Sequence, residues 1–305
     1  MSTVLAFKPP EEEVSSIAVP VAEVEAVAEP VSELAEFPQL SAGHRLREGL
    51  ARVAGRMLPP LIGFGLLIGL WGLATMKGGA IPSPAQVWAA AVQLFSDPFY
   101  RNGPNDQGIG WNVLSSLQRV GIGFGFAALV GIPLGFLLGR FETLNRMFDP
   151  VISLLRPVSP LAWLPIGLLV FQKADPAATW TIFICSIWPM IINTAVGVQR
   201  VPQDYLNVAR VLNLPESKVI TKILFPAVLP YMLTGIRLSI GTAWLVIVAA
   251  EMLTGGVGIG FWVWDEWNNL KVEHIVIAIF VIGIVGLILE QALLLLASRF
   301  QYESR

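Results

Sequence analysis

The sequence predicts an all-α membrane protein, a polytopic bundle of about six transmembrane helices. Hydrophobic residues make up 54% of the 305 residues and charged residues only 14%, with a mean hydropathy of +0.66. A soluble domain typically carries about 25% charged residues. The apolar residues also lie in long blocks separated by charged clusters, a pattern typical of helices that cross hydrocarbon.

Each expected span is a stretch poor in charge. At a rise of 1.5 Å per residue, about 20 residues reach about 30 Å, the thickness of the hydrocarbon core. The expected spans are 57–76, 120–139, about 151–171, 176–199, about 229–251 and 274–298. Three charged residues interrupt them, Arg156 in the third span, Arg237 in the fifth and Glu290 in the sixth, and Glu251 is the last residue of the fifth.

The basic residues favour one orientation. If the N-terminus is cytoplasmic, twelve lysines and arginines lie in the cytoplasmic segments that follow the N-terminal tail and four in external segments. Cytoplasmic loops of membrane proteins carry such an excess of Lys and Arg. The sequence therefore predicts a multi-pass protein of a bacterial cytoplasmic inner membrane, with both termini in the cytoplasm.

Residues 1–43 differ from the rest, and we expect a disordered acidic cytoplasmic tail before a transmembrane domain at 44–305. The first forty residues hold eight glutamates and a single lysine, Lys8. A segment of this composition cannot bury a core. No uninterrupted apolar stretch follows a basic start, so the tail is not a secretory signal peptide. It is either inert or binds a basic partner surface.

Several classes of function are disfavoured by what the sequence lacks. One cysteine, Cys185, excludes an internal disulfide and a multi-cysteine metal site, and we expect no metal or cofactor on this chain. A net charge of −2 gives no basic field for nucleic acid. No Gly-Lys-Ser/Thr triplet and no Gly-x-Ser-x-Gly motif occurs, which disfavours a P-loop ATPase and other enzymes. An ion-driven secondary transporter remains an alternative, although no internal repeat supports it.

Two external connections are long enough to hold structure. The segment 77–118 is expected to contain a surface helix that begins at Pro84 and is capped by Ser83. The segment 252–273 is rich in Gly and Trp and predicts either an interfacial turn or a lid over a pore. A glycine at every fourth position of 131–139 allows close backbone packing, within the bundle or across a dimer.

The segment 199–228, between the fourth and fifth spans, predicts two short amphipathic helices at a sharp angle. Pro202 suits the start of the first helix, and Asn213 can close it in a left-handed conformation. Pro215 starts the second helix. The apolar face of the first helix is expected to hold Tyr205, Val208, Ala209 and Leu212, and that of the second Val219, Ile220 and Ile223. Such a pair suits insertion into a groove on another protein.

This segment resembles the EAA loop of permease subunits of ABC importers of the methionine-permease-like fold. Asn207-Val208-Ala209, Asn213 and Ile223-Leu224-Phe225-Pro226 keep the spacing of that loop, whereas its leading Glu, one Ala, the Gly and the Leu are replaced. The resemblance implies contact with ATPase subunits through the following residues: Tyr205, Asn207, Val208, Ala209, Arg210, Leu212, Asn213, Leu214 and Pro226.

The resemblance extends from about Trp111 to Phe300. Residues 156–165, RPVSPLAWLP, are similar to a segment of sulfonate, taurine and nitrate permeases, and residues 249–261 are similar to cyanobacterial nitrate and bicarbonate permease subunits. The family implies a type I ABC importer in a cyanobacterial inner membrane, with nitrate (and nitrite) as substrate, or alternatively bicarbonate, a sulfonate or cyanate. It also implies a second permease copy, forming a homodimer, two ATPase subunits that bind ATP and Mg, and an external substrate-binding protein.

Polar residues inside the spans are the candidates for a translocation pathway. A charge in a bilayer is costly, by about 2.5–3.5 kcal/mol on insertion scales, and is often functional. The candidates are Arg156, Trp163, Asn193, Arg237, Thr242 and Glu251. Arg237 could attract an anion, pair with a carboxylate or reach the membrane surface. Glu251 could instead hydrogen-bond the glycine-rich turn that follows it.

Overall fold

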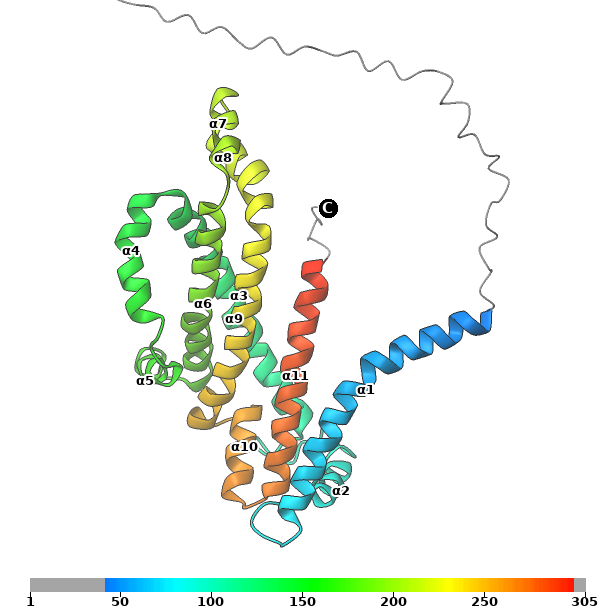
Figure 1. Cartoon of the computed structure of the whole chain (residues 1–305). Helices are drawn as coiled ribbons and strands as arrows, with labels where there is room; N and C mark the ends of the chain where they lie inside the picture. The colour runs from blue at the N-terminus through cyan, green and yellow to red at the C-terminus, as the bar shows by residue number, and fades with distance from the viewer. Residues whose placement is uncertain (1–41, 299–305) are drawn as a thin grey trace, which may run out of the picture. The chain divides into compact units, whose positions relative to one another are not determined.

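The computed structural model describes residues 42–298, most of them in helices (Figure 1). The helices are α1 (Ala42–Thr75), α2 (Pro84–Leu94), α3 (Ile109–Arg140), α4 (Glu142–Leu155), α5 (Pro160–Phe171), α6 (Ala174–Gln199), α7 (Gln203–Val211), α8 (Glu216–Val219), α9 (Phe225–Thr254), α10 (Ile259–Asn268) and α11 (Val272–Ser298). A π-helical turn, Ile220–Leu224, joins α8 to α9. The predicted acidic tail lies outside the described residues except for its last two positions, which begin α1.

By its contacts the chain divides between Leu67 and Ile68. In the first unit, α1 contains Pro59 and Pro60 and exposes large apolar side chains from Met57 onward. The second unit holds the end of α1 and all later helices. An exposed apolar surface of this kind is expected of a helix that faces lipid.

Five described segments are long and apolar enough to cross a membrane, and a sixth crossing exists if the bent pair α4–α5 counts as one. The five segments are Met57–Thr75, Ile109–Arg140, Ala174–Gln199, Glu216–Thr254 and Val272–Ala297. They include five of the six predicted spans almost completely. The all-α architecture of about six transmembrane helices is therefore confirmed.

The third predicted span, about 151–171, is not one straight helix. Helices α4 and α5 meet at an angle of 99°. Pro157 lacks the N–H that a continuing helix would need, and Pro160 takes the first position of α5, where a missing N–H is tolerated. Arg156 therefore lies at the end of α4, beside the bend, and not inside a straight span.

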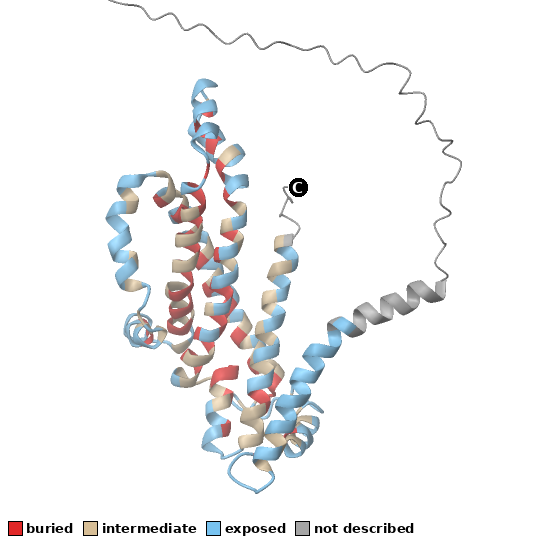
Figure 2. Ribbon diagram, in the orientation of Figure 1, coloured by how far each residue is buried: buried red, intermediate tan, exposed pale blue. Residues whose placement is uncertain are grey.

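The core of the second unit runs along α6 and α9 (Figure 2), which bury Met190 and Ile247 among other residues. Helix α3 packs closely against α6. A Cβ on Gly135 would lie 2.6 Å from Thr194 Cβ, and one on Gly139 would lie 2.6 Å from Val198 Cβ. The predicted glycine spacing thus serves packing within the bundle.

The structure confirms one of the two expectations for the connections predicted to be external. Helix α2 begins at Pro84, and Ser83 and Gln86 form a capping box, which confirms the predicted helix and its Ser83 cap. The Gly- and Trp-rich segment is not mainly a turn, because α10 follows after four residues. Trp262 of α10 is buried and stacks on His274, with ring centroids 5.8 Å apart.

Candidate functional site

The short helices α7 and α8 project at one end of the second unit, here called the α7 end, and α2 and α10 lie at the opposite, α10 end (Figure 1). Helix α7 buries Leu206 and Ala209 in an apolar cluster. Tyr205, Val208 and Leu212 are each more than half exposed. The predicted apolar face is therefore divided: Ala209 holds α7 to the bundle, and the other three side chains are free for a contact.

The end of α7 has the left-handed cap that the sequence predicts. Asn213 has a φ of 49°, and the Leu214 N–H donates to the Ala209 carbonyl over 3.0 Å, the six-to-one bond of a Schellman motif. Before the cap, Arg210 Nη1 donates to Asn207 Oδ1 over 3.2 Å. These bonds fix the direction in which the chain leaves α7.

The second predicted helix of this segment is not a separate element. Helix α8 continues through the π turn into α9, so that Glu216–Thr254 is one helical segment of 39 residues. The Phe225 N–H donates to the Ile220 carbonyl, and Pro226 has no N–H with which to bond the Lys222 carbonyl. The missing donor accounts for a widened turn at this point, and α8 is a direct extension of α9.

A cavity of about 330 Å³ brings together three of the six candidate pathway residues. Arg156 enters it from the end of α4, Asn193 from α6 and Thr242 from α9. The Asn193 amide donates to Pro189 over 2.8 Å, and the Thr242 hydroxyl donates to Leu238 over 2.9 Å, each within its own helix. Among the described residues of the lining Arg156 is the one that is charged, so the cavity favours an anion.

Arg237 is paired. Its Nε donates to Glu290 Oε1 over 2.9 Å, and Nη2 contacts the same oxygen. Both residues line a second cavity of about 700 Å³ between α9 and α11, which Thr242 also lines. The sequence leaves three roles open for Arg237, and in the structure Arg237 pairs with a carboxylate. The pair cancels the positive charge that would attract an anion to this cavity.

Glu251 and Trp163 lie outside both cavities. Glu251 is 1% exposed near the α10 end and accepts hydrogen bonds from the Ser116 hydroxyl over 2.8 Å and the Gly260 N–H over 3.0 Å. The bond from Gly260 agrees with the expected contact to the glycine-rich turn. Trp163 packs edge-to-face on Trp180, with ring centroids 5.9 Å apart. Both residues therefore have structural contacts in the bundle.

Arg119 is a further charged residue of the bundle that the sequence did not single out. Its Nη1 donates to Glu251 Oε1 over 2.6 Å and to the Val257 carbonyl over 2.7 Å. Its Nη2 lies 2.7 Å from Asp175 Oδ1. One guanidinium thus joins α3 to α6, to α9 and to the turn before α10.

Two uncharged residues of α3 complete this polar cluster. Asn112 Oδ1 accepts the Gly258 N–H, and Ser116 Oγ accepts the Ile259 N–H, each over 2.9 Å. These bonds satisfy backbone donors at the start of α10, which has no side-chain cap of its own. Asn112, Ser116 and Arg119 lie at spacings of four and three, which form one polar stripe on an apolar helix. That stripe is the signal by which the sequence could have revealed the cluster.

A second charged cluster lies where α10 meets α11. Glu266 is 6% exposed, and its Oε2 lies 3.0 Å from His274 Nδ1 and 3.5 Å from Lys271 Nζ, without a well-aligned hydrogen bond. Burial by itself raises the pKa of Glu266. The contact with His274 and the charge of His274 lower it, Lys271 lowers it further, and the resulting pKa lies below its ordinary value. The ionised carboxylate therefore helps to hold the α10–α11 junction together.

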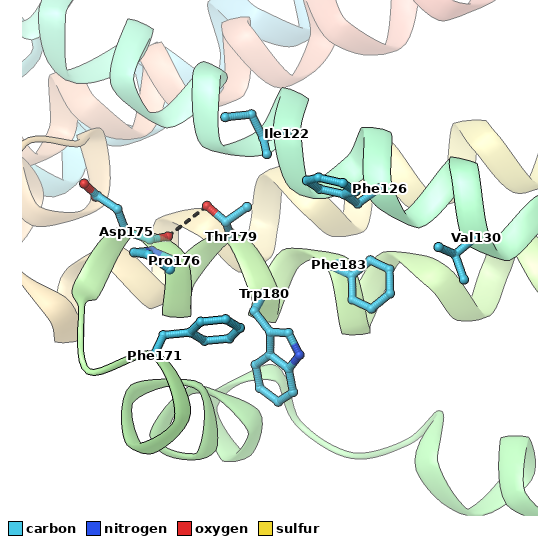
Figure 3. A pocket seen from close by; sticks show the side chains of 9 residues that line it. All are labelled: Ile122, Phe126, Val130, Phe171, Asp175, Pro176, Thr179, Trp180 and Phe183. Carbon is cyan, nitrogen blue, oxygen red and sulfur yellow. Dashed lines mark hydrogen bonds between the residues drawn. The ribbon is translucent and has the colours of Figure 1, made fainter.

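A third cavity, of about 540 Å³, lies between α3, α5 and α6. Figure 3 shows Ile122 and Phe126 of α3 on one side of it and Phe171 and Trp180 on the other. Within residues 42–298, no lysine or arginine lines this cavity. Aromatic and aliphatic walls without a cation do not favour an anion, so this cavity is not a candidate for the pathway.

Comparison with known proteins identifies the family. Residues 131–302 match the family described as "Binding-protein-dependent transport system inner membrane component". The nitrate import permease protein NrtB of Leptolyngbya laminosa is 49% identical over 244 residues, which cover 80% of this chain and 88% of that protein. The bicarbonate transport system permease protein CmpB of a Synechocystis species is 44% identical over 243 residues, which cover 78% and 87%.

Among solved structures, the MetNI methionine ABC transporter in an inward-facing conformation is similar, with a TM-score of 0.46 and 16% identity over 60% of this chain and 94% of that chain. The family match spans α4 to α11, and with them α7 and the Arg156 cavity. This multi-pass chain therefore belongs to the family of binding-protein-dependent transport system inner membrane components.

Proposed function

We propose that this chain is the transmembrane permease subunit of an ATP-driven importer for nitrate, and for nitrite with it. The observation that carries the substrate is the 49% identity to a nitrate import permease along 80% of the chain. Two further nitrate import permeases are 47% and 44% identical. The bicarbonate permeases, at 43–44% identity, make bicarbonate the second candidate. Both anions are small, flat and singly charged.

The Arg156 cavity is the geometric support for an anion pathway. Arg156, Asn193 and Thr242 reach it from three different elements, and no carboxylate from the described part of the chain lines it. A guanidinium offers planar donors that match the oxygens of a flat oxyanion. Since Arg156 lies at the α4–α5 bend, a change of that bend would move it relative to α6 and α9.

In this proposal the α7 end faces the cytoplasm and contacts the ATPase subunits. Tyr205, Val208 and Leu212 offer an exposed apolar surface there, and α8 leads directly into α9. ATP and Mg bind to the separate ATPase subunits, because the sequence has no Gly-Lys-Ser/Thr triplet. An external substrate-binding protein then delivers the anion at the α10 end.

A second copy of this chain completes the pathway in the proposal. Helix α4 buries none of its residues and exposes Met147, Phe148, Val151 and Leu154. Lipid or a second copy must cover such a surface. A homodimer that places the two Arg156 cavities towards one shared axis would make use of it.

The substrate is tested by uptake of labelled nitrate and labelled bicarbonate in cells with and without this chain, at low external concentration. We expect loss of nitrate uptake alone when the chain is absent. Loss of bicarbonate uptake alone would support the importer assignment but contradict nitrate as the substrate. Loss of neither would overturn the proposed function.

The ATPase contact is tested by pull-down. Ala209 is buried, so a charge there would disrupt α7 itself, whereas Val208 and Leu212 are exposed. We expect the Val208→Glu and Leu212→Glu variants to lose the ATPase subunits while remaining in the membrane. Leu270→Asp is the matched control, because Leu270 is an exposed leucine at the α10 end. Retention of the ATPases in both α7 variants would contradict the assignment.

A further inference from the structure

A polar cavity of about 440 Å³ lies at the α7 end and has no part in the proposed pathway. It is formed where the α3–α4 corner, the end of α6 and the start of α7 meet. Arg140, Asn145, Gln199 and Gln203 line it. Its volume is within the range of small-ligand sites, and polar groups from four helices converge on it.

Arg140 has donors to spare in this cavity. Its Nη2 donates to Glu216 Oε1 of α8 over 3.0 Å, whereas its Nε is buried without a hydrogen-bond partner. A guanidinium carries five N–H donors, and a buried donor left unsatisfied is costly. The site therefore lacks an acceptor beside Arg140.

Three amide side chains and one helix terminus add to the donors. Asn145, Gln199 and Gln203 each bring an amide to the lining. Gln203 is also the first residue of α7, a helix of nine residues whose first-turn N–H groups have no side-chain cap. Uncapped N–H groups at a helix start favour an anion.

The carboxylates nearby offset the charge of Arg140 but leave its Nε donor without a partner. Glu142 lines the cavity, but its Oε1 accepts a hydrogen bond from Arg146 Nη2 over 2.5 Å. Asp204, in the first turn of α7, is exposed and is not part of the lining. Glu216 holds only one of the Arg140 nitrogens. The lining thus keeps a local excess of donors.

We propose that this cavity binds a small inorganic oxyanion, such as nitrate or phosphate, between Arg140 and the start of α7. A bound anion competes with Glu216 for the Arg140 guanidinium. Because α8 continues into α9, occupancy of the cavity changes how α3 is tied to the base of α9. This inference goes beyond the proposed function, and only the ATPase subunits of the complex used in its test rest on that function.

The test uses the purified complex of this chain with its ATPase subunits, without ATP, titrated with nitrate and with phosphate by calorimetry. All proteins carry Arg156→Gln, so that the Arg156 cavity does not contribute. We expect saturable binding of at least one anion, weakened about tenfold or more by Arg140→Gln, since a charge-assisted hydrogen bond is lost. Asn145→Leu is expected to weaken it as well, and it decides the result if Arg140→Gln does not assemble.

Lys222→Gln is the matched control. Lys222 is an exposed cation at the same end that does not line the cavity, so its variant should bind as the parent does. The inference is overturned if the parent shows no saturable binding, or if neither Arg140→Gln nor Asn145→Leu weakens it. Uptake of nitrate and bicarbonate that is unchanged in cells without this chain would instead overturn the proposed function and leave this binding result unaffected.

Discussion

At the scale of single residues, Arg119 shows how a buried charge in the bundle becomes tolerable. Its partners Asp175 and Glu251 lie 56 and 132 positions away in the sequence, and Glu251 also accepts bonds from Ser116 and Gly260. Arg119 is thus held by two charge-assisted contacts, and the Glu251 carboxylate accepts further hydrogen bonds from a hydroxyl and from a backbone N–H. A span boundary drawn from charge alone places Arg119 at an end, because local sequence does not contain its distant partners.

The first prediction concerns this cluster. Glu251→Gln removes the carboxylate charge beside Arg119, and breaking one side of a buried pair is expected to lower the free energy of unfolding by about 3 kcal/mol or more. Denaturation of the purified protein in detergent measures it. Arg146→Gln is the control, because that helical pair is exposed and should contribute no more than about 0.5 kcal/mol. Equal effects of the two variants would contradict a role for burial.

The second prediction concerns pH. The pKa of Glu266 is lowered in the folded protein, so its stabilising contribution is fully present above the ordinary value of 4.5 and is lost as the pH falls through the lowered pKa. We expect Glu266→Gln to have a lower thermal midpoint than the parent at pH 7, with the difference shrinking below pH 4.5. A difference in thermal midpoint that stays constant across that range would show that the ionic contacts of Glu266 with His274 and Lys271 do not cause it.

At the scale of helices, the sequence predicts the helix caps, which depend on hydrogen bonds within one turn. It does not predict how the helices bend or continue at proline residues. The Ser83 cap of α2 and the left-handed Asn213 follow from residues within one turn, and both are confirmed. The bend between α4 and α5 and the continuation of α8 into α9 are not predicted. In both cases the outcome depends on how the backbone accommodates Pro157 and Pro226.

The third prediction tests the close contact of α3 with α6. A methyl group at Gly135 would meet Thr194 Cβ at 2.6 Å and the Ile191 carbonyl at 2.8 Å, so Gly135→Ala should destabilise the protein by about 1–3 kcal/mol. Gly121→Ala is the matched control in the same helix, where a Cβ would have nothing within 4 Å. We expect the control to be neutral or stabilising, because Ala favours helix more than Gly does. Denaturation of both variants in detergent measures their free energies of unfolding. Equal stability of the two variants would contradict a close contact at Gly135.

At the scale of the whole molecule, the candidate pathway separates into residues that share a cavity and residues that do not. Charge, polarity and an apolar context nominated Arg156, Arg237 and Glu251 alike. Only tertiary structure reveals that Glu290 neutralises Arg237 and that Arg119 neutralises Glu251. The sequence could nominate intramembrane charges, but not their pairing, because pairing depends on how distant helices pack.

The fourth prediction follows from that separation. Arg156→Gln removes the one charge of its cavity and should reduce nitrate uptake about tenfold or more, as expected for the loss of a charge-assisted contact to the anion. Arg156→Lys keeps the charge without the planar donors and should restore part of the uptake. The Arg237→Gln, Glu290→Gln double variant removes a neutral pair and should leave uptake within about twofold of the parent.

Labelled nitrate uptake, at matched membrane levels of each variant, measures all three. Full uptake by Arg156→Gln together with loss in the double variant would move the pathway to the cavity between α9 and α11.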